Sequence, residues 1–379
     1  MRLDFQHLME QATALTRGGR LQDATEVIQR ALHGPGNGEG PRPHASGDVI
    51  DVEAREVPTP AEDQGTALPS PTTRREELGP QAAEPAWTEK PAAPAAATPE
   101  AFLHGRHGGP GAAGRDFKLY VPPNAGTQPR PLVVMLHGCT QDADDFAAGT
   151  RMNALAREHG VFVLYPIQAQ QANQQRCWNW FKHTHQQRER GEPALVAGMV
   201  REVMAAHAID ASRIYVAGLS AGGAMAAILG RTHPDLFAAV GVHSGLAAGA
   251  ARDLPSALEA MKGGAKGVPL SGDNVPPTIV FHGSADRTVH PRNGEQVVQP
   301  FGPGREEAPS QAAAGRRSST RRVWRDASGE IRAEHWLVQG APHAWSGGST
   351  TGSYTDPSGP DASAEMLRFF LAHPRRAPG

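Results

Sequence analysis

The chain has 379 residues, enough for one large domain with accessory segments, and its net charge of −2 gives no electrostatic reason to expect nucleic acid as a partner. Glycine (43) and proline (33) are frequent while aromatic residues make up 6%, which indicates that part of the chain does not pack into a core. Asp4 stands where a signal peptide would need apolar residues, and no apolar stretch is long enough to span a membrane. A cytoplasmic protein is therefore expected.

The N-terminal third differs in composition from the rest of the chain. Residues 1–32 are predicted to form a helical hairpin, because apolar residues recur at helical spacing on both sides of Gly18-Gly19. Such a hairpin is too short to bury its own apolar face, so we expect it to dock on the rest of the chain or on a partner. Residues 33–100 are rich in proline, alanine, glycine and glutamate, which is typical of a disordered linker.

Residues 101–374 are predicted to form one α/β domain, with folding resuming near Arg115 and an edge strand over 117–121. Short apolar runs typical of buried strands then alternate with helical patterns. The further expected strands are 131–136, 161–165, 213–217, 237–242, 278–281 and 334–338, and the expected helices are 146–159, 195–207 and 362–372. This alternation predicts a doubly wound, mostly parallel sheet with helices on both faces. Residues 302–322 lack periodicity and are expected to be a surface loop insertion.

The segment Gly218-Leu219-Ser220-Ala221-Gly222 follows a predicted strand and precedes an alanine-rich helical pattern. It matches the G-x-S-x-G nucleophile elbow, in which a serine lies on a sharp turn with its hydroxyl exposed. Glycine is needed on either side because a side chain there would collide with the neighbouring elements. A glycine-rich chain can contain this pentapeptide by chance, so the strand, turn and helix around it carry the prediction. Ser220 is the predicted nucleophile.

A nucleophilic serine needs a histidine base and a carboxylate that orients the imidazole. In chains with this elbow, the acid and then the base follow the serine, in loops after later strands. Asp286 lies in the loop after the strand expected at 278–281. The competing acids are Asp273, which precedes that strand, and Glu295, which lies in a helical pattern. Position therefore favours Asp286.

The chain has 17 histidines, so each candidate base is judged by its place. His343 lies in the loop directly after the last predicted strand, where the base is expected. His335 lies inside that strand and His373 at the end of the last helix. His290 is the alternative, because it is close to Asp286 in sequence.

Two N–H groups are expected to stabilise the oxyanion of a tetrahedral intermediate. One belongs to the residue after the nucleophile, Ala221, and the other to an early strand-to-helix loop. Residues 136–140 follow the first buried strand, and Cys139 is the expected donor because Gly138 lets the backbone approach a substrate. Taken alone, His137-Gly138 would be read as an ordinary turn.

These motifs together resemble the esterases of the polyhydroxybutyrate (PHB) depolymerase family, within the α/β-hydrolase superfamily, over about residues 105–370. The motifs in chain order are Leu136-His137-Gly138-Cys139-Thr140-Gln141, Cys177-Trp178-Asn179-Trp180-Phe181, Gly218-Leu219-Ser220-Ala221-Gly222-Gly223, His282-Gly283-Ser284-Ala285-Asp286 with Thr288-Val289, and His343-Ala344-Trp345-Ser346-Gly347-Gly348. One departure is Pro342, where we expect glycine; proline fixes φ beside the base.

The resemblance implies a serine esterase that cleaves carboxylic esters through an acyl-enzyme, with PHB or 3-hydroxybutyrate oligomers as the leading substrate. Acetyl or feruloyl esters of polysaccharides are the alternative. An alternative of another class is a tethered polymer- or partner-binding module with little turnover. Secreted members of the family make an extracellular location the alternative to the cytoplasm.

The resemblance also implies that Trp178 and Trp180 lie near the substrate, and Trp345 beside the base is a third candidate for substrate contact. Cys139 and Cys177 head two of the motifs, so a disulfide between them is one expectation and two free thiols are the other. His183 and His185 have no carboxylate cluster nearby and are expected in a solvated loop. Neither a metal nor a cofactor is expected.

Overall fold

The computed structural model describes residues 98–108, 114–267, 275–306 and 315–375. The predicted hairpin (1–32) and almost all of the predicted linker (33–100) lie outside the described residues. The described residues belong to one compact unit, Ala95–Gly379. Among them, no helix is both long and apolar enough to cross a bilayer.

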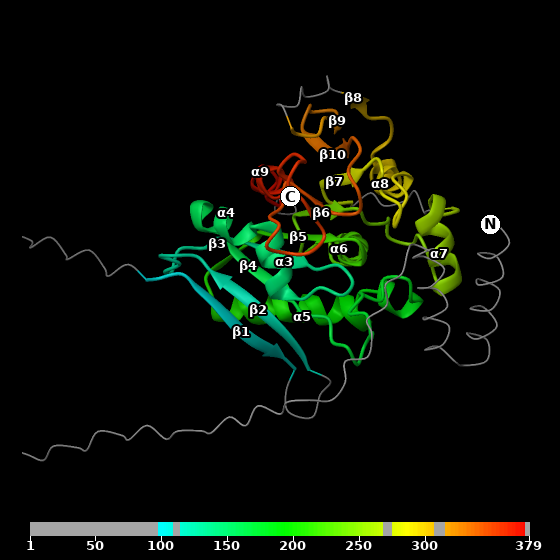
Figure 1. Ribbon diagram of the computed structural model, residues 1–379. Coiled ribbons are helices and arrows are strands. Elements are labelled where there is room, and N and C mark those ends of the chain that lie inside the picture. The colour runs from blue at the N-terminus through cyan, green and yellow to red at the C-terminus, as the bar shows by residue number, and fades with distance from the viewer. Residues whose placement is uncertain (1–97, 109–113, 268–274, 307–314, 376–379) are drawn as a thin grey trace, which may run out of the picture. The chain divides into compact units, whose positions relative to one another are not determined.

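A single large sheet forms the centre of the described part of the chain, with ten strands in the order β1-β2-β4-β3-β5-β6-β7-β10-β9-β8 (Figure 1). The strands are β1 (Ala101–His107), β2 (Arg115–Val121), β3 (Arg130–Leu136), β4 (Phe162–Pro166), β5 (Ile209–Leu219), β6 (Ala239–His243), β7 (Thr278–Gly283), β8 (Arg305–Glu306), β9 (Ser319–Arg325) and β10 (Ile331–Val338). Neighbours from β4 to β10 pair in parallel, while the outer strands pair antiparallel. The predicted fold class is confirmed.

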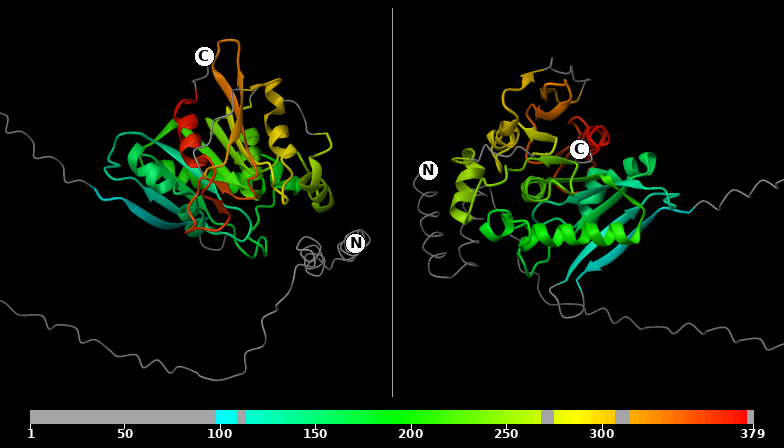
Figure 2. Two further views of the ribbon diagram at one scale, coloured as in Figure 1. Left: turned by 45° about the horizontal axis from the view of Figure 1, so that its top comes forward. Right: turned by 180° about the vertical axis from the view of Figure 1, so that it is seen from behind.

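Both faces of the sheet are buried under helices (Figures 1 and 2). Successive side chains of a strand point to opposite faces, and those of β3 alternate between two apolar clusters. The first cluster includes residues of α5 (Gly191–Ala206), α6 (Ala221–Thr232), α7 (Leu254–Gly263) and α8 (Arg292–Val298). The second includes residues of α3 (Ala143–Thr150), α4 (Met152–His159) and α9 (Ala362–Leu371). Short elements complete the unit: η1 (His183–Gln186), η2 (Gln299–Phe301), β11 (Trp345–Ser346) and β12 (Thr355–Asp356).

The N-terminal side of the sheet differs from the prediction in two places. β1 precedes the expected edge strand and pairs with it antiparallel. Its apolar residues Phe102 and Leu103 are adjacent in sequence, so no apolar alternation marked this segment as a strand. Their side chains are 39% and 45% exposed. The helix expected over 146–159 is two helices, because Arg151 between α3 and α4 has a left-handed φ of 56°. The apolar spacing continues across this break and does not reveal it.

The predicted surface loop over 302–322 is also partly wrong. Ser319–Arg325 forms β9, which pairs antiparallel with β10, and Arg305–Glu306 forms the short β8 beside it. Val323 and Trp324 of β9 are buried, but its arginines and serines hid the strand pattern. These strands extend the parallel centre of the sheet on the side of β10.

Candidate active site

Ser220 occupies a sharp turn between β5 and α6. Its φ of 57° and ψ of −119° are uncommon for a residue other than glycine. A Cβ atom at Gly218 would overlap the backbone of Gly222, and one at Gly222 would overlap the carbonyl oxygen of Leu136 in β3. The turn can therefore close only because both flanking positions lack side chains.

Asp286 and His343 meet although they lie 57 positions apart. Asp286 follows β7 and His343 follows β10, and these strands are parallel neighbours. The His343 Nδ1 atom lies 2.7 Å from Asp286 Oδ2, while the N–H groups of Thr288 and Val289 donate to Oδ1. The Asp286 side chain has no exposed area and that of His343 is 12% exposed.

The Asp286 carboxyl is a buried ion. Burial alone would raise its pKa, but hydrogen bonds from His282 and His343 outweigh burial and hold the pKa well below the usual range. His282, whose side chain is fully buried, places Nε2 3.4 Å from Asp286 Oδ2. Asp286 therefore stays ionised at neutral pH and can stabilise an imidazolium at His343.

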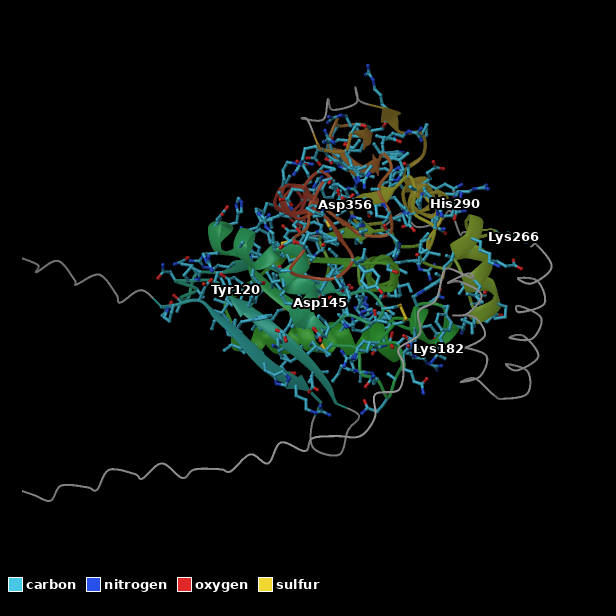
Figure 3. All side chains as sticks on the ribbon, viewed as in Figure 1. Tyr120, Asp145, Lys182, Lys266, His290 and Asp356 are labelled. Atoms are coloured by element: carbon cyan, nitrogen blue, oxygen red, sulfur yellow. A yellow bond between two sulfur atoms is a disulfide. The ribbon has the colours of Figure 1, made fainter. Side chains whose placement is uncertain are left out.

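His290, the alternative base, is exposed and lies at the start of the segment leading into α8 (Figure 3). Its Nδ1 accepts a hydrogen bond from the Arg292 N–H, 3.2 Å away. The carboxylate partner is thus found at His343 and not at His290 among the described hydrogen bonds.

The loop after β3 leaves one backbone donor free. The N–H of Gly138 donates to Gln141 Oε1 at 2.9 Å, and that of Thr140 donates to the Gln175 carbonyl at 2.6 Å. Between them, the N–H of Cys139 has no acceptor within the described residues. Its neighbours are fixed, so this donor is held in place for an acceptor from outside the chain.

Two further groups at the elbow have no partner in the part of the chain that the structure describes. The Ser220 hydroxyl makes no hydrogen bond there, and contacts of this kind often close only when substrate is bound. The N–H of Ala221 belongs to the first residue of α6, where no preceding turn of helix supplies an acceptor. A hydroxyl, two backbone donors and an imidazole oriented by a carboxylate are the groups that acyl transfer requires.

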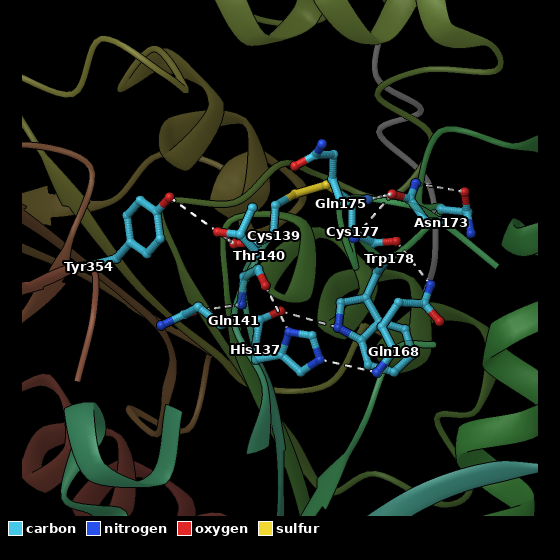
Figure 4. Close-up of a disulfide and its surroundings, with 12 residues drawn as sticks. His137, Cys139, Thr140, Gln141, Gln168, Asn173, Gln175, Cys177, Trp178 and Tyr354 are labelled. Carbon is cyan, nitrogen blue, oxygen red and sulfur yellow. Dashed lines mark hydrogen bonds between the residues drawn. A yellow bond between two sulfur atoms is a disulfide. The ribbon is translucent and has the colours of Figure 1, made fainter. Parts of the chain in front are cut away.

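A disulfide between Cys139 and Cys177 ties the loop after β3 to the loop of the predicted aromatic motif (Figure 4). Beside it, Trp178 Nε1 donates to the His137 carbonyl at 3.2 Å. The loop that carries the free Cys139 donor is therefore attached covalently and by hydrogen bonds to a second segment.

Glu192 in α5 forms hydrogen bonds that hold the segment containing the aromatic motif. Its buried carboxylate accepts 2.7 Å hydrogen bonds from both the backbone and the side chain of Asn179 and one of 2.6 Å from Gln168 Nε2. Burial alone would raise the pKa of Glu192, but His185 and these donors hold it below its ordinary value. Glu192 was not predicted as part of the site, because a single glutamate in the first turn of a helix usually serves only the helix dipole.

The three tryptophans predicted to contact substrate are buried in the described structure. Trp178, Trp180 and Trp345 are 0%, 6% and 1% exposed. Trp178 and Trp180 pack in the cluster on one face of the sheet and Trp345 in the cluster on the other. Aromatic residues in a polar loop are buried here because the loop itself folds back onto the core.

Replacing both cysteines by alanine is expected to lower the free energy of unfolding by about 2–4 kcal/mol, because the bridge closes a loop between residues 38 positions apart. The kcat for ester hydrolysis should fall by about 10-fold only, because hydrogen bonds from Gly138 to Gln141 and from Trp178 to His137 still hold the loop. Urea unfolding and ester hydrolysis measure the two effects. Dithiothreitol should shift the wild-type unfolding midpoint and leave that of the double variant in place; equal midpoints without reductant would contradict the prediction.

Within the described residues, no group of three or more histidine, cysteine, aspartate or glutamate side chains could hold a metal ion. His183 and His185 lie in η1.

His243 is a residue near the site that the sequence analysis missed. Its carbonyl accepts the Ser220 N–H at 2.9 Å. A histidine at the end of the buried strand next to the nucleophile strand was the available signal.

Residues 115–323, more than half of the chain, match the profile of a family described as "Esterase PHB depolymerase". Over 183 residues the chain is 39% identical to poly(3-hydroxyalkanoate) depolymerase C of Paucimonas lemoignei, covering 45% of this chain and 44% of that protein. Over 198 residues it is 31% identical to feruloyl esterase B of Neurospora crassa, covering 48% and 66%. The chain thus aligns with only part of each of these relatives.

Among solved structures, an acetyl xylan esterase from Aspergillus awamori matches 68% of this chain and 94% of its own, with a TM-score of 0.52 and 21% identity. At this identity the likeness concerns the fold.

Proposed function

Because this chain belongs to the esterase PHB depolymerase family, we propose that it is a serine esterase that hydrolyses carboxylic esters through an acyl-enzyme. The observation that carries the proposal is the 2.7 Å pair between His343 Nδ1 and Asp286 Oδ2, which follow two neighbouring strands of the sheet. Ser220 directly follows β5 in the same sheet. Serine, acid and base occur in the chain order of α/β hydrolases.

In the proposed reaction, Ser220 Oγ attacks the ester carbonyl carbon while His343 Nε2 takes the hydroxyl proton. The N–H groups of Cys139 and Ala221 donate to the oxyanion that forms. The C–O bond to the alcohol then breaks, and His343 gives its proton to the leaving alkoxide. Water, deprotonated by His343, attacks the acyl-enzyme in the same way and releases the acid. Asp286 stays ionised and orients the imidazole throughout.

For the substrate, we propose polyesters or oligomers of 3-hydroxy acids, with PHB and 3-hydroxybutyrate oligomers first. The 39% identity to a protein named as a poly(3-hydroxyalkanoate) depolymerase supports this order over feruloyl or acetyl polysaccharide esters, since the chain is 31% identical to a feruloyl esterase and 30% identical to an acetylxylan esterase. The proposed catalytic domain is residues 101–374, with residues 1–100 outside it. The Cys139–Cys177 disulfide supports the extracellular alternative over the cytoplasm, because disulfides persist in oxidising compartments.

The test compares hydrolysis of a soluble 3-hydroxybutyrate oligomer with that of a feruloyl and an acetyl sugar ester, using Ser220→Ala as the blank. We expect kcat/KM for the oligomer to be at least about 10-fold higher, a difference of about 1.4 kcal/mol in transition-state binding. Preference for either sugar ester would overturn the substrate assignment and leave the esterase assignment standing. No hydrolysis of any of the three above the blank would count against both.

A further inference from the structure

His243 contacts both the nucleophile turn and the loop that carries the base. It is the last residue of β6, which lies between β5 and β7 in the sheet. Its carbonyl oxygen accepts the Ser220 N–H at 2.9 Å, and its ring Nε2 accepts the Ser346 N–H at 2.9 Å. Ser346 follows His343 by three positions in the same loop. One residue therefore links the backbone of the nucleophile to the loop that carries the base.

We propose that His243 is a positioning residue that sets the distance between Ser220 and His343 through its Nε2 hydrogen bond to Ser346. The inference rests on the proposed esterase function. It assigns His243 no contact with substrate, because the side chain is buried and only 1% of the residue is exposed.

The ring is contacted by two aromatic side chains and at both nitrogens. It stacks on Trp345, with ring centroids 4.9 Å apart, and on Phe281, with centroids 5.8 Å apart. Because Nε2 accepts a hydrogen bond, the ring proton is on Nδ1, which lies 3.2 Å from Ser244 Oγ. Trp345, expected to contact substrate, instead forms one wall of this stack.

The imidazole must stay neutral to keep accepting at Nε2. Burial, followed by the nearby His282 and His343, lowers the pKa of His243 well below its usual value, and Asp286 opposes this only in part. His282 lies in β7, the strand next to β6, while Asp286 and His343 lie in the segments that follow β7 and β10. The acceptor is thus present at neutral pH.

Several hydrogen bonds hold the base loop, among them the pair between His343 and Asp286 and the bond from the Trp345 N–H to the Tyr354 carbonyl, 2.7 Å away. Besides the bond to His243, the Gly347 N–H donates to the Asp356 carbonyl at 2.8 Å and Ser346 Oγ donates to the Pro360 carbonyl at 2.7 Å. Both of these bonds hold the loop to the following segment, whereas the His243 bond holds it to the sheet beside Ser220. Loss of the His243 bond should therefore displace the loop relative to the nucleophile.

Two substitutions separate this role from packing. His243→Phe keeps a stacked ring and removes the acceptor, while His243→Gln loses the ring and keeps an acceptor oxygen near the place of Nε2. We expect kcat on a soluble 3-hydroxybutyrate oligomer to fall by about 10- to 100-fold in His243→Phe, the effect of a misplacement on the order of 1 Å, with KM changed less than about threefold. His243→Gln should retain kcat within about fivefold of the wild type.

His233→Phe is the matched control, because His233 is also fully buried, at the end of α6, but contacts neither Ser220 nor the base loop within the described hydrogen bonds. It should keep wild-type kcat. Full kcat in a folded His243→Phe variant, or equal loss in His243→Phe and His243→Gln, would overturn the proposal, and thermal unfolding reports folding in each case. The esterase assignment is tested separately by Ser220→Ala: an active wild type and an inactive Ser220→Ala leave it intact whatever His243 does.

Discussion

Ser220→Ala is expected to lower kcat by about 10⁵- to 10⁶-fold, because a serine, its base and its acid act as one unit and nothing else in the site can form the acyl-enzyme. KM should change little, since the methyl group of alanine leaves the surroundings of the turn unchanged. Hydrolysis of a soluble ester, followed by release of the alcohol, measures the loss.

The control is Ser328→Ala, which removes the hydroxyl of an exposed serine in the turn between β9 and β10. It should leave kcat at the wild-type value. More than about 1% of wild-type kcat in purified Ser220→Ala would show that another group is the nucleophile. Activity at that level is far above the rate that binding and oxyanion stabilisation alone would leave.

Asp286→Asn is expected to lower kcat by about 10⁴-fold, the loss typical of a triad whose acid becomes an amide. The amide oxygen can still accept from Thr288 and Val289, so the loop should keep its shape. The amide NH₂ then takes the place of Oδ2 beside His343 Nδ1. Because the NH₂ group can only donate, it cannot accept the Nδ1 proton. His343 is driven to the tautomer with its proton on Nε2, which cannot take the proton of Ser220.

Steady-state kinetics measure this loss, and Asp253→Asn is the matched control. Asp253 is the exposed N-cap of α7, and asparagine is as good an N-cap as aspartate, so activity and stability should both be retained. If Asp286→Asn kept wild-type kcat while remaining folded, the carboxylate would have no part in orienting the base.

The parallel centre of the sheet could be predicted because its strands are buried on both faces and read as continuous apolar runs. Of the outer strands, β2 was predicted but β1, β8 and β9 were not, because many of their side chains are exposed or charged. β1 leaves Phe102 and Leu103 in contact with solvent, and β9 contains Arg321, Arg322 and Arg325. Their pairing with β2 and β10 depends on the rest of the sheet and not on local pattern.

The part of the candidate site that could be predicted from sequence consists of residues whose type, at a turn after a strand, indicates a catalytic role. Ser220, Asp286 and His343 were singled out by their places after strands, and the structure brings Asp286 and His343 together. The residues that hold the site, such as Glu192 and His243, were not predicted because they belong to no motif with a known chemical role. The three tryptophans were assigned to the substrate because sequence does not distinguish a groove wall from a loop that folds inward.

The order of the strands constrains when activity can first appear. His343 follows β10, and β10 finds its place only by pairing with β7 on one side and β9 on the other. The segment of Ser220 and the loop of Cys139 can be built before this, from β3, β5 and β6 alone. A domain generally folds as a unit, and parallel pairing across long loops is slow. Ester hydrolysis is then among the last properties that a newly made or refolding molecule acquires, so an incompletely folded chain does not cleave esters by this route.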